Sequence, residues 1–173
     1  KMAYDLEEQE QLDEFKAWWK ANGKMVTNLV IAVLVAYAAY QGFNYYQNKQ
    51  ALNASTQYQE LVVIDTKDLK VVQEKSAVLI DKYAGTPYAG RAALFAAKAN
   101  YQANEVKSAK AQLEWANSNA KESTVRAIAS LQLANILFEE KSYDAALKLL
   151  AAPHDAGFDG LFADLKGDIL VAQ

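Results

Sequence analysis

The chain has 173 residues, and its 18 Lys or Arg against 21 Asp or Glu give a formal net charge of −3, which argues against a nucleic-acid-binding surface. It contains no Cys and only one His, which excludes disulfides and Cys-based zinc sites and argues against His-based catalysis. With only seven Gly, two Pro and 52% apolar residues, the composition favours an all-α chain.

The first predicted element is an amphipathic helix within residues 1–24, which we expect in the cytoplasm. Leu12, Phe15 and Trp19 recur at helical spacing, and six acidic residues lie within the first fourteen positions. We expect Trp18 and Trp19 at the level of the lipid headgroups, where tryptophan is enriched. The acidic run is either a solvated helix face or a docking site for a cytoplasmic partner.

Residues 25–46 are predicted to form a transmembrane helix. No charged residue lies between Lys24 and Lys49, and the apolar stretch from Val26 to Phe43 would extend about 27 Å at ~1.5 Å per residue. This length approaches the ~30 Å hydrocarbon core of a bilayer, and the long side chain of Lys24 can reach the headgroups. The residues expected at the two membrane interfaces are Trp18, Trp19, Lys24, Tyr40, Tyr45 and Tyr46.

Two other interpretations of the apolar stretch remain open. One is a buried helix of a soluble core, although such helices seldom keep so long a run without charge. The other is a cleaved signal peptide, because Ala36-Tyr37-Ala38 has the small-x-small form of a cleavage site. A signal peptide begins with a short basic region, whereas here an acidic region of two dozen residues comes first. We therefore expect an uncleaved anchor.

The distribution of Lys and Arg predicts the orientation of this anchor. Lys16, Lys20 and Lys24 precede the span, whereas only Lys49 lies within about fifteen residues after it. Since the more basic flank stays in the cytoplasm, we expect residues 47–173 to cross the membrane. In a bacterium this places them in the periplasm.

Residues 47–173 are predicted to form a domain of paired helices. Apolar residues recur at helical spacing almost throughout, and no alternating strand pattern of useful length occurs. Thr86 and Pro87 have the form of an N-cap followed by proline at the first helical position. The expected helices cover residues 69–83, 88–102, 105–119, 123–140, 143–151 and 160–172.

An internal repeat with a period of 37 residues links these helices. The shift superposes five identical residues: Ala92 on Ala129, Leu94 on Leu131, Ala97 on Ala134, Ala109 on Ala146, and Leu113 on Leu150. The small residues allow two helices to approach closely, and the leucines fill the space between neighbouring hairpins. This is the pattern of tetratricopeptide hairpins, whose usual period is about 34 residues. The sequence thus predicts an α-solenoid of tetratricopeptide-like hairpins after the transmembrane helix.

A third helix of the repeat begins near Asp164, with Gly167 at the small position, and the sequence ends at Gln173 before a partner helix. A single hairpin buries little apolar area, so repeat domains need stacking and a capping helix. We therefore expect the periplasmic domain to continue with one more helix after Gln173.

The register of the repeat assigns a candidate groove for a partner. In a tetratricopeptide array the first helix of each hairpin lines the concave face, through which solenoids bind. Tyr101 and Phe138 are equivalent and could hold an apolar side chain of a partner, or both rings could pack in the core. The groove candidates are Lys98, Tyr101, Gln102, Asn135, Phe138 and Glu139.

No residue pattern points to catalysis or to a metal. His154 has no Cys, His or other evident ligand at metal spacing, and we expect it to be a solvated loop residue. No pair of carboxylates is marked by its sequence context as a general acid and base. We expect no enzymatic activity, no cofactor and no metal.

Motifs near both ends of the chain resemble one family. They are Phe15-Lys16-Ala17-Trp18 followed by Asn22-Gly23-Lys24 and the apolar span, and Ala163-Asp164-Leu165-Lys166-Gly167-Asp168. Together they resemble the YfgM-type ancillary subunit of the bacterial SecYEG translocon. The resemblance implies a single-pass inner-membrane protein with a periplasmic tetratricopeptide-like domain and no catalytic residues. It also implies association with SecYEG and with a membrane-anchored periplasmic peptidyl-prolyl isomerase chaperone.

The leading hypothesis for function is a tethered adaptor that holds a chaperone or an emerging secretory polypeptide beside the translocon. Anchoring next to the channel raises the effective concentration, so that weak contacts suffice. The alternative is a structural membrane scaffold that self-associates and is unrelated to translocation. Co-purification from detergent would distinguish the two, because the scaffold would be recovered only as a homo-oligomer.

Overall fold

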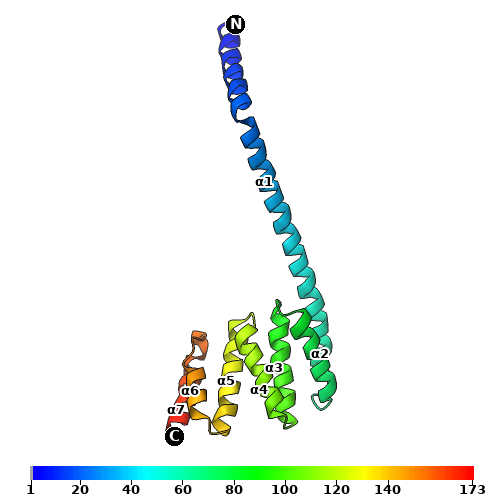
Figure 1. Ribbon diagram of the computed structural model, residues 1–173, viewed down its shortest axis with the longest axis vertical. Coiled ribbons are helices and arrows are strands. Elements are labelled where there is room, and N and C mark those ends of the chain that lie inside the picture. The colour runs from blue at the N-terminus through cyan, green and yellow to red at the C-terminus, as the bar shows by residue number, and fades with distance from the viewer. Residues whose placement is uncertain (1) are drawn as a thin grey trace. The chain divides into compact units, whose positions relative to one another are not determined.

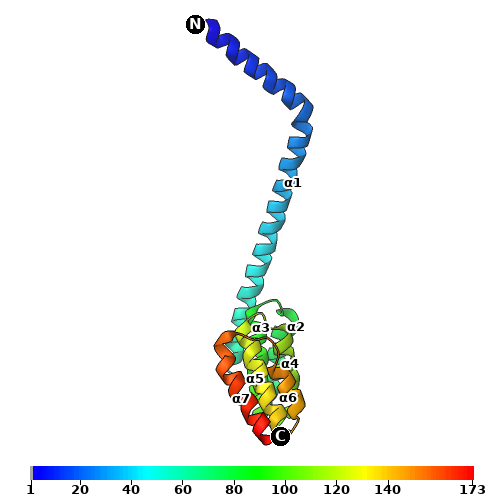
Figure 2. The same ribbon diagram turned by 90° about the vertical axis from the view of Figure 1, so that its left-hand side faces the viewer.

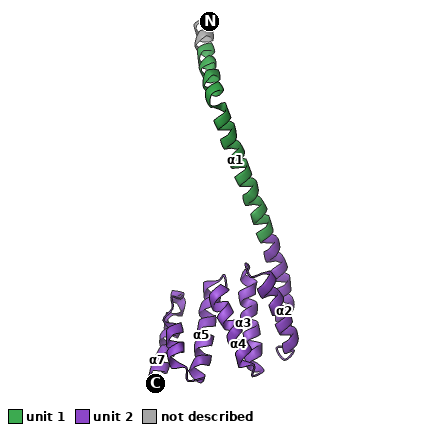
Figure 3. Cartoon of the chain, in the orientation of Figure 1, with its two compact units in different colours: residues 1–47 green, residues 48–173 purple. Residues whose placement is uncertain are grey.

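The computed structural model describes residues 2–173, with side chains from residue 8 onward. All of the regular secondary structure in this part of the chain is helical. No β-strand occurs among the described residues, and the predicted all-α class is confirmed. The chain divides into two compact units, residues 1–47 and residues 48–173, which are described separately below (Figure 3).

The first unit is the greater part of helix α1, Met2–Val62. This helix contains an 18-residue window with a mean hydropathy of 1.6, none of which is buried in the protein. Apolar side chains point outward on every side of it; Leu34, for example, is 61% exposed. A helix that is apolar all round needs an apolar surrounding, which a bilayer provides. The helix is therefore a candidate membrane span by length and composition.

A single helix replaces the two that the sequence predicted on either side of Gly23. Glycine weakens a helix, but here the indole ring of Trp19 packs over it, so that a Cβ on Gly23 would lie 3.1 Å from Trp19 Nε1. No proline interrupts the helix before Val62, and it continues well beyond the predicted end of the span at Tyr46.

The second unit is a series of helices that follow one another side by side along the chain (Figures 1 and 2). After the last part of α1, its elements are α2 (Leu69–Lys82), α3 (Pro87–Gln102), α4 (Val106–Asn119), α5 (Ser123–Glu139), α6 (Tyr143–Leu150), the 3-10 helix η1 (Ala156–Phe158) and α7 (Asp159–Ala172). The predicted helices from residue 69 onward correspond to these one by one. Pro87 begins α3 after an extended Thr86, as the sequence indicated.

The helices of the second unit form two layers. Each helix contacts the next one along the chain, and in addition α3 contacts α5 and α5 contacts α7. Helices α3, α5 and α7 therefore make one layer, here called the inner layer, and α4 and α6 belong to the other. This arrangement of stacked hairpins confirms the predicted tetratricopeptide-like solenoid.

The residues that define the repeat lie in the core. Ala97, Ala109, Ala134 and Ala146 are fully or almost fully buried. Leu113 is 2% exposed and belongs to the apolar cluster shared by α3, α4 and α5. Its equivalent Leu150 lies in the next cluster, shared by α5, α6 and α7. Equivalent small and large residues thus pack in the same way in two successive hairpins.

An additional hairpin precedes those found in the sequence, because the end of α1 packs against α2 and α3. Ala54 and Leu61 are completely buried there, and the ring centroid of Tyr58 lies 5.7 Å from that of Tyr88. Lys75 Nζ on α2 also pairs with Glu60 Oε2 at 2.6 Å. Residues 48–62 therefore serve as the first helix of a hairpin whose second helix is α2.

The role predicted for Gly167, close approach of the helix expected after Gln173, stays a prediction. Among the described residues, no atom lies within 4 Å of a Cβ built on Gly167. The buried face of α7 is formed by Phe162, Leu165 and Ile169, which pack against α5 and α6. The expected helix after Gln173 stays a prediction.

Candidate partner-binding groove

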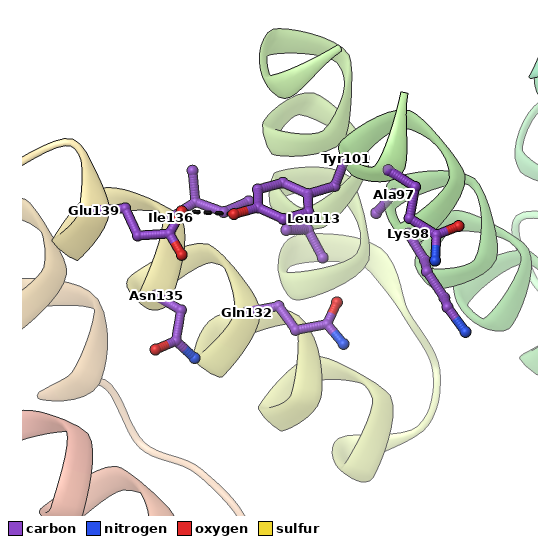
Figure 4. Close-up of a pocket in the computed structure, with 9 residues that line it drawn as sticks. Ala97, Lys98, Tyr101, Leu113, Gln132, Asn135, Ile136 and Glu139 are labelled. Carbon is purple, nitrogen blue, oxygen red and sulfur yellow. Dashed lines mark hydrogen bonds between the residues drawn. The ribbon is translucent and has the colours of Figure 1, made fainter. Parts of the chain in front are cut away.

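A cavity of about 630 Å³ opens between α3, α4 and α5 and is here called the α3–α5 groove (Figure 4). Its floor is apolar and comes from three helices, with Ala97 on α3, Leu113 on α4 and Ile136 on α5 all buried. The small side chain of Ala97 leaves room above it. The rim is polar and consists of Lys98, Tyr101, Gln102, Gln132, Asn135 and Glu139.

Five of the six groove candidates from the sequence line this cavity: Lys98, Tyr101, Gln102, Asn135 and Glu139. The repeat register brings them together because each lies on the exposed side of α3 or α5. Whether a partner binds there stays a prediction. Gln132 was missed, although its spacing of three residues from Asn135 places it on the same helix face.

Phe138 is the candidate that the structure places elsewhere. It is half-buried in the cluster shared by α5, α6 and α7, with its ring centroid 6.0 Å from that of Tyr143. The corresponding position in the preceding hairpin is Val106, which offers no ring to stack against. Phe138 also lacks the hydroxyl that draws Tyr101 toward the groove. The alternative interpretation, packing in the core, is correct for Phe138 but not for Tyr101.

A hydrogen bond closes one part of the groove. Tyr101 Oη donates to Glu139 Oε2 at 2.6 Å and so joins α3 to α5 (Figure 4). This bond stabilises the protonated phenol, and together with desolvation and the charge of Glu139 it raises the pKa of Tyr101. Both side chains are exposed, so the contact can break without disturbing the core.

The other polar groups of the rim have no partner within the described part of the chain. Lys98, Gln102, Gln132 and Asn135 make no ion pair and no side-chain hydrogen bond there. By contrast, the buried Asn100 donates to Ala96 O at 2.8 Å and accepts from Gln73 at 2.6 Å. The amides and the amine of the groove are therefore free to bind another molecule, whereas the amide of Asn100 in the core is already satisfied.

A second, smaller cavity of about 210 Å³ continues the inner layer between α5 and α7 and is here called the α5–α7 groove. Asn135 lines both cavities, so the two grooves adjoin at this residue. Asp164 and Asp168 on α7 line the second groove together with Leu131, Leu161 and Leu165. Sequence reasoning found the α7 motif but did not assign these carboxylates to a groove.

Outside the groove, an ion pair joins α3 to the residue before α5. Arg91 on α3 donates two hydrogen bonds to Glu122, of 2.8 Å from Nε and 2.6 Å from Nη2. This pairing lowers the pKa of Glu122 and raises that of Arg91. Close by, a Cβ on Gly90 would lie only 2.7 Å from the Cβ of Ala120, so α3 and the loop before α5 are in tight contact.

His154 is packed rather than solvated, contrary to expectation. Its ring stacks on Phe162 with centroids 3.6 Å apart, and Nδ1 lies 3.0 Å from Ala152 O. Nε2 lies 3.1 Å from Asp159 Oδ1 but makes no hydrogen bond within the described residues. Within residues 8–173 no group of His, Asp and Glu has a geometry that could hold a metal ion.

The predicted membrane-interface residues are exposed along α1. Trp18 and Trp19 form an aromatic group with Phe15, with ring centroids 6.1–6.4 Å apart. Lys24, Tyr40, Tyr45 and Tyr46 are likewise exposed. Their place at the membrane interfaces stays a prediction.

Comparison with known proteins gives consistent results over nearly the whole chain. The pattern of the family described as "Tetratricopeptide repeat-like domain" matches residues 16–173. The ancillary SecYEG translocon subunit of Neisseria gonorrhoeae is 35% identical and aligns with 99% of this chain and 83% of its own. The proteins of the same name from Haemophilus influenzae and Escherichia coli are 29% and 28% identical, covering 84% and 80% of their own lengths. No solved structure matches the chain significantly.

Proposed function

Because the chain belongs to the tetratricopeptide repeat-like family of ancillary SecYEG translocon subunits, we propose that it is a membrane-anchored, non-enzymatic adaptor at the bacterial SecYEG translocon. The observation that carries this proposal is the similarity over 99% of the chain, which includes the apolar helix as well as the repeats. A likeness limited to the repeats would have indicated the fold alone.

The proposed location is the inner membrane, which the chain crosses once through residues 25–46. Residues 1–24 lie in the cytoplasm and residues 47–173 in the periplasm, since Lys16, Lys20 and Lys24 precede the span. The exposed apolar surface of α1 supports this location, because it would be costly in water.

The proposed partners are SecYEG, a membrane-anchored periplasmic peptidyl-prolyl isomerase chaperone, and emerging secretory polypeptides. The α3–α5 groove is the surface on which we expect a chaperone or an emerging chain to bind. Its apolar floor and the four unpaired polar side chains of its rim, Lys98, Gln102, Gln132 and Asn135, are typical of a site that accepts both apolar side chains and main-chain groups.

The experiment that tests this proposal is photocrosslinking in cells from Gln102 and Asn135, followed by co-purification in mild detergent. We expect capture of a periplasmic chaperone or a secretory polypeptide from both positions, and recovery of SecYEG with the chain. Asp81 and Glu114 are the control positions, because both are exposed and lie outside the grooves. Recovery of the homo-oligomer alone would reject the adaptor in favour of a self-associating scaffold.

A further inference from the structure

The part of α1 that precedes the apolar stretch has an exposed apolar face. Leu12, Phe15 and Trp19 recur along it at helical spacing, and Trp18 lies beside them. These four side chains are 47–58% exposed. The three aromatic rings lie close together, with centroids 6.1–6.4 Å apart. The four residues therefore form one continuous surface, here called the aromatic face, whose exposure to water is unfavourable.

The opposite side of this segment is polar and charged. Glu10 and Asp13 lie there, and Asp13 Oδ1 accepts a hydrogen bond of 3.3 Å from Lys16 Nζ. Lys16 and Lys20 follow Leu12 at intervals of four residues, so they lie along one border of the aromatic face. The long side chain of a lysine at such a border can extend over apolar surface to reach lipid phosphates. Helices with this pattern commonly lie in the plane of a membrane surface.

The distance from the membrane span distinguishes two arrangements of this segment. If the segment continued straight along the span, Phe15 would lie about 15 Å and Leu12 about 20 Å beyond Met25, at ~1.5 Å per residue. The headgroup layer is only about 5–8 Å thick on each side of the bilayer, so both side chains would face water. Trp18 and Trp19 lie close to this layer in either arrangement. Leu12 and Phe15 reach it only if the segment turns into the plane of the membrane.

Gly23 allows the chain to turn at this point. Figure 2 shows that α1 bends within the first unit, near the beginning of the apolar stretch. Glycine permits a bend because it has no side chain and a flexible backbone. The indole of Trp19 fills the space that a side chain would take, since Nε1 lies 3.1 Å from a Cβ built on Gly23. In the same turn, Asn22 Nδ2 donates to Trp18 O at 3.2 Å and satisfies this main-chain carbonyl.

From this geometry we propose that residues 8–22 lie flat in the headgroup layer, on the side of the membrane from which the N-terminus emerges. This inference rests on the membrane span of the proposed function and goes beyond it. The aromatic face is turned toward the acyl chains, and Glu10 and Asp13 face water. Lipid rather than protein covers the aromatic face, because a single glycine joins the segment to a helix that is already in the membrane.

Apolar contact, and not charge, holds the segment at the membrane surface. Residues 8–24 contain four acidic residues and three lysines, so their net charge gives no attraction to anionic lipid. The flat arrangement is therefore expected in vesicles of phosphatidylcholine, which has no net charge.

The test uses a single tryptophan as a depth reporter in the full chain, reconstituted in phosphatidylcholine vesicles with or without brominated acyl chains. The three native tryptophans are first replaced by Phe. The reporter is then introduced by Phe15→Trp on the aromatic face or by Ala17→Trp on the opposite side. Because bromine quenches a nearby indole, Phe15→Trp should lose most of its emission in the brominated vesicles and Ala17→Trp little of it.

This pair of positions separates the two arrangements. Along the chain Ala17 is nearer the span than Phe15, so a straight segment would give Ala17→Trp the stronger quenching. Leu12→Ser removes an apolar side chain of the aromatic face and should weaken the quenching of Phe15→Trp. Ala21→Ser, on the same side as Ala17, is the matched control and should leave it unchanged. Far-UV circular dichroism shows that each variant keeps its helicity.

The proposal is rejected if Ala17→Trp is quenched as strongly as Phe15→Trp, or if Leu12→Ser and Ala21→Ser act alike. An emission of Phe15→Trp that brominated lipid leaves unchanged would also reject it and would assign the aromatic face to a protein partner. Val35→Trp, in the middle of the span, tests the proposed membrane location separately. If this reporter is not quenched, both the location and the flat arrangement fail. If it is quenched and Phe15→Trp is not, only the flat arrangement fails.

Discussion

Asn104 and Lys141 end the inner helices α3 and α5 in the same way, one repeat apart. Both have a positive φ, of 63° and 61°. The next residue in each case donates a hydrogen bond of 2.8 Å to a carbonyl five residues earlier, from Glu105 to Asn100 and from Ser142 to Leu137. These bonds are those of a Schellman motif, which usually has glycine at the left-handed position.

The first prediction concerns Lys141, since a lysine is strained in this conformation. Lys141→Gly should raise the free energy of unfolding by about 0.5–1 kcal/mol, because the left-handed region costs a non-glycine residue more than the added chain entropy of glycine. Asn104→Gly should change it less, because asparagine tolerates this region better. Urea denaturation of the full chain in detergent measures the free energy of unfolding of both variants. A loss of stability in Lys141→Gly would show that the strain is absent.

The second prediction concerns the hydroxyl of Tyr101. Its pKa is raised by donation to Glu139, so this phenol should ionise at higher pH than a free tyrosine, whose pKa is about 10. Any stabilisation by the contact is fully present below the pKa of an unfolded tyrosine, about 10, and is lost as the pH rises through the raised pKa of Tyr101. Glu139→Gln should return the ionisation of Tyr101 toward lower pH. The ultraviolet titration of each chain minus that of its Tyr101→Phe form isolates this one phenol.

Among elements, α3 and α5 are joined by the pair of Arg91 and Glu122, which gives the third prediction. Glu122→Gln should destabilise the chain at pH 7 by at most about 1 kcal/mol, since the two side chains are 42% and 31% exposed. The pKa of Glu122 is lowered in the folded state, so its contribution is present above its unfolded pKa and is lost as the pH falls through the lower folded value.

The measurement is denaturation of wild type and variant at pH 7 and again near pH 3. The difference between them should shrink as the pH falls from the unfolded pKa of Glu122 toward its lower folded value, because the wild-type carboxylate then begins to take up a proton. Glu114→Gln, at an exposed position with no partner in the described structure, should show no difference at either pH. An unchanged effect of Glu122→Gln in acid would mean that the amide disturbs the fold for another reason.

The small residues of the repeat give the fourth prediction. Ala134 is completely buried in the cluster shared by α5, α6 and α7. Ala134→Leu adds three carbon atoms to a closed site and should cost about 1–3 kcal/mol through overpacking. Ala111→Leu, on the exposed side of α4, should be nearly neutral. Equal effects in thermal unfolding would contradict the role of Ala134 in setting the distance between helices.

For the helices, the sequence alone was sufficient to predict position and buried residues wherever the packing repeats from one hairpin to the next. The 37-residue shift located Ala97, Ala134 and the helices around them, because each hairpin has the same neighbours. It failed where the neighbours differ. Phe138 meets the ring of Tyr143 while Tyr101 meets a carboxylate, and the shift alone does not distinguish these surroundings. The α5–α7 groove was missed for the same reason, since it joins residues of two elements that no short motif contains.

The end of α1 shows a second limit of sequence reasoning. Ala54, Tyr58 and Leu61 lie at a spacing of four and then three residues, which is typical of one helix face. They lie soon after the predicted span, which ends at Tyr46. Because the long apolar stretch precedes them, this short helical pattern was not recognised as part of the second unit. The buried side chains show that residues 48–62 already form part of the solenoid.

For the whole molecule, the absence of cysteine makes the proposed orientation directly testable. A single Cys introduced at Gln9 or at Asn119, both exposed, is the only thiol in the chain. In spheroplasts, a membrane-impermeant maleimide should label Asn119→Cys at once and Gln9→Cys only after lysis. This fifth prediction follows from the three lysines before the span and the single lysine soon after it.

The same labelling can test the physical cause of the orientation. Replacing Lys16, Lys20 and Lys24 by Gln removes the basic excess on the N-terminal side while the apolar helix stays the same. A substantial part of the chains should then insert in reverse, so that Gln9→Cys becomes accessible in spheroplasts. Replacing three acidic residues of the same region by Gln should leave the labelling unchanged, since Asp and Glu contribute little to topology. If neither the lysine nor the acidic replacements alter the labelling, then charge does not orient this helix. Contacts with the translocon would then have to determine the periplasmic placement of the grooves.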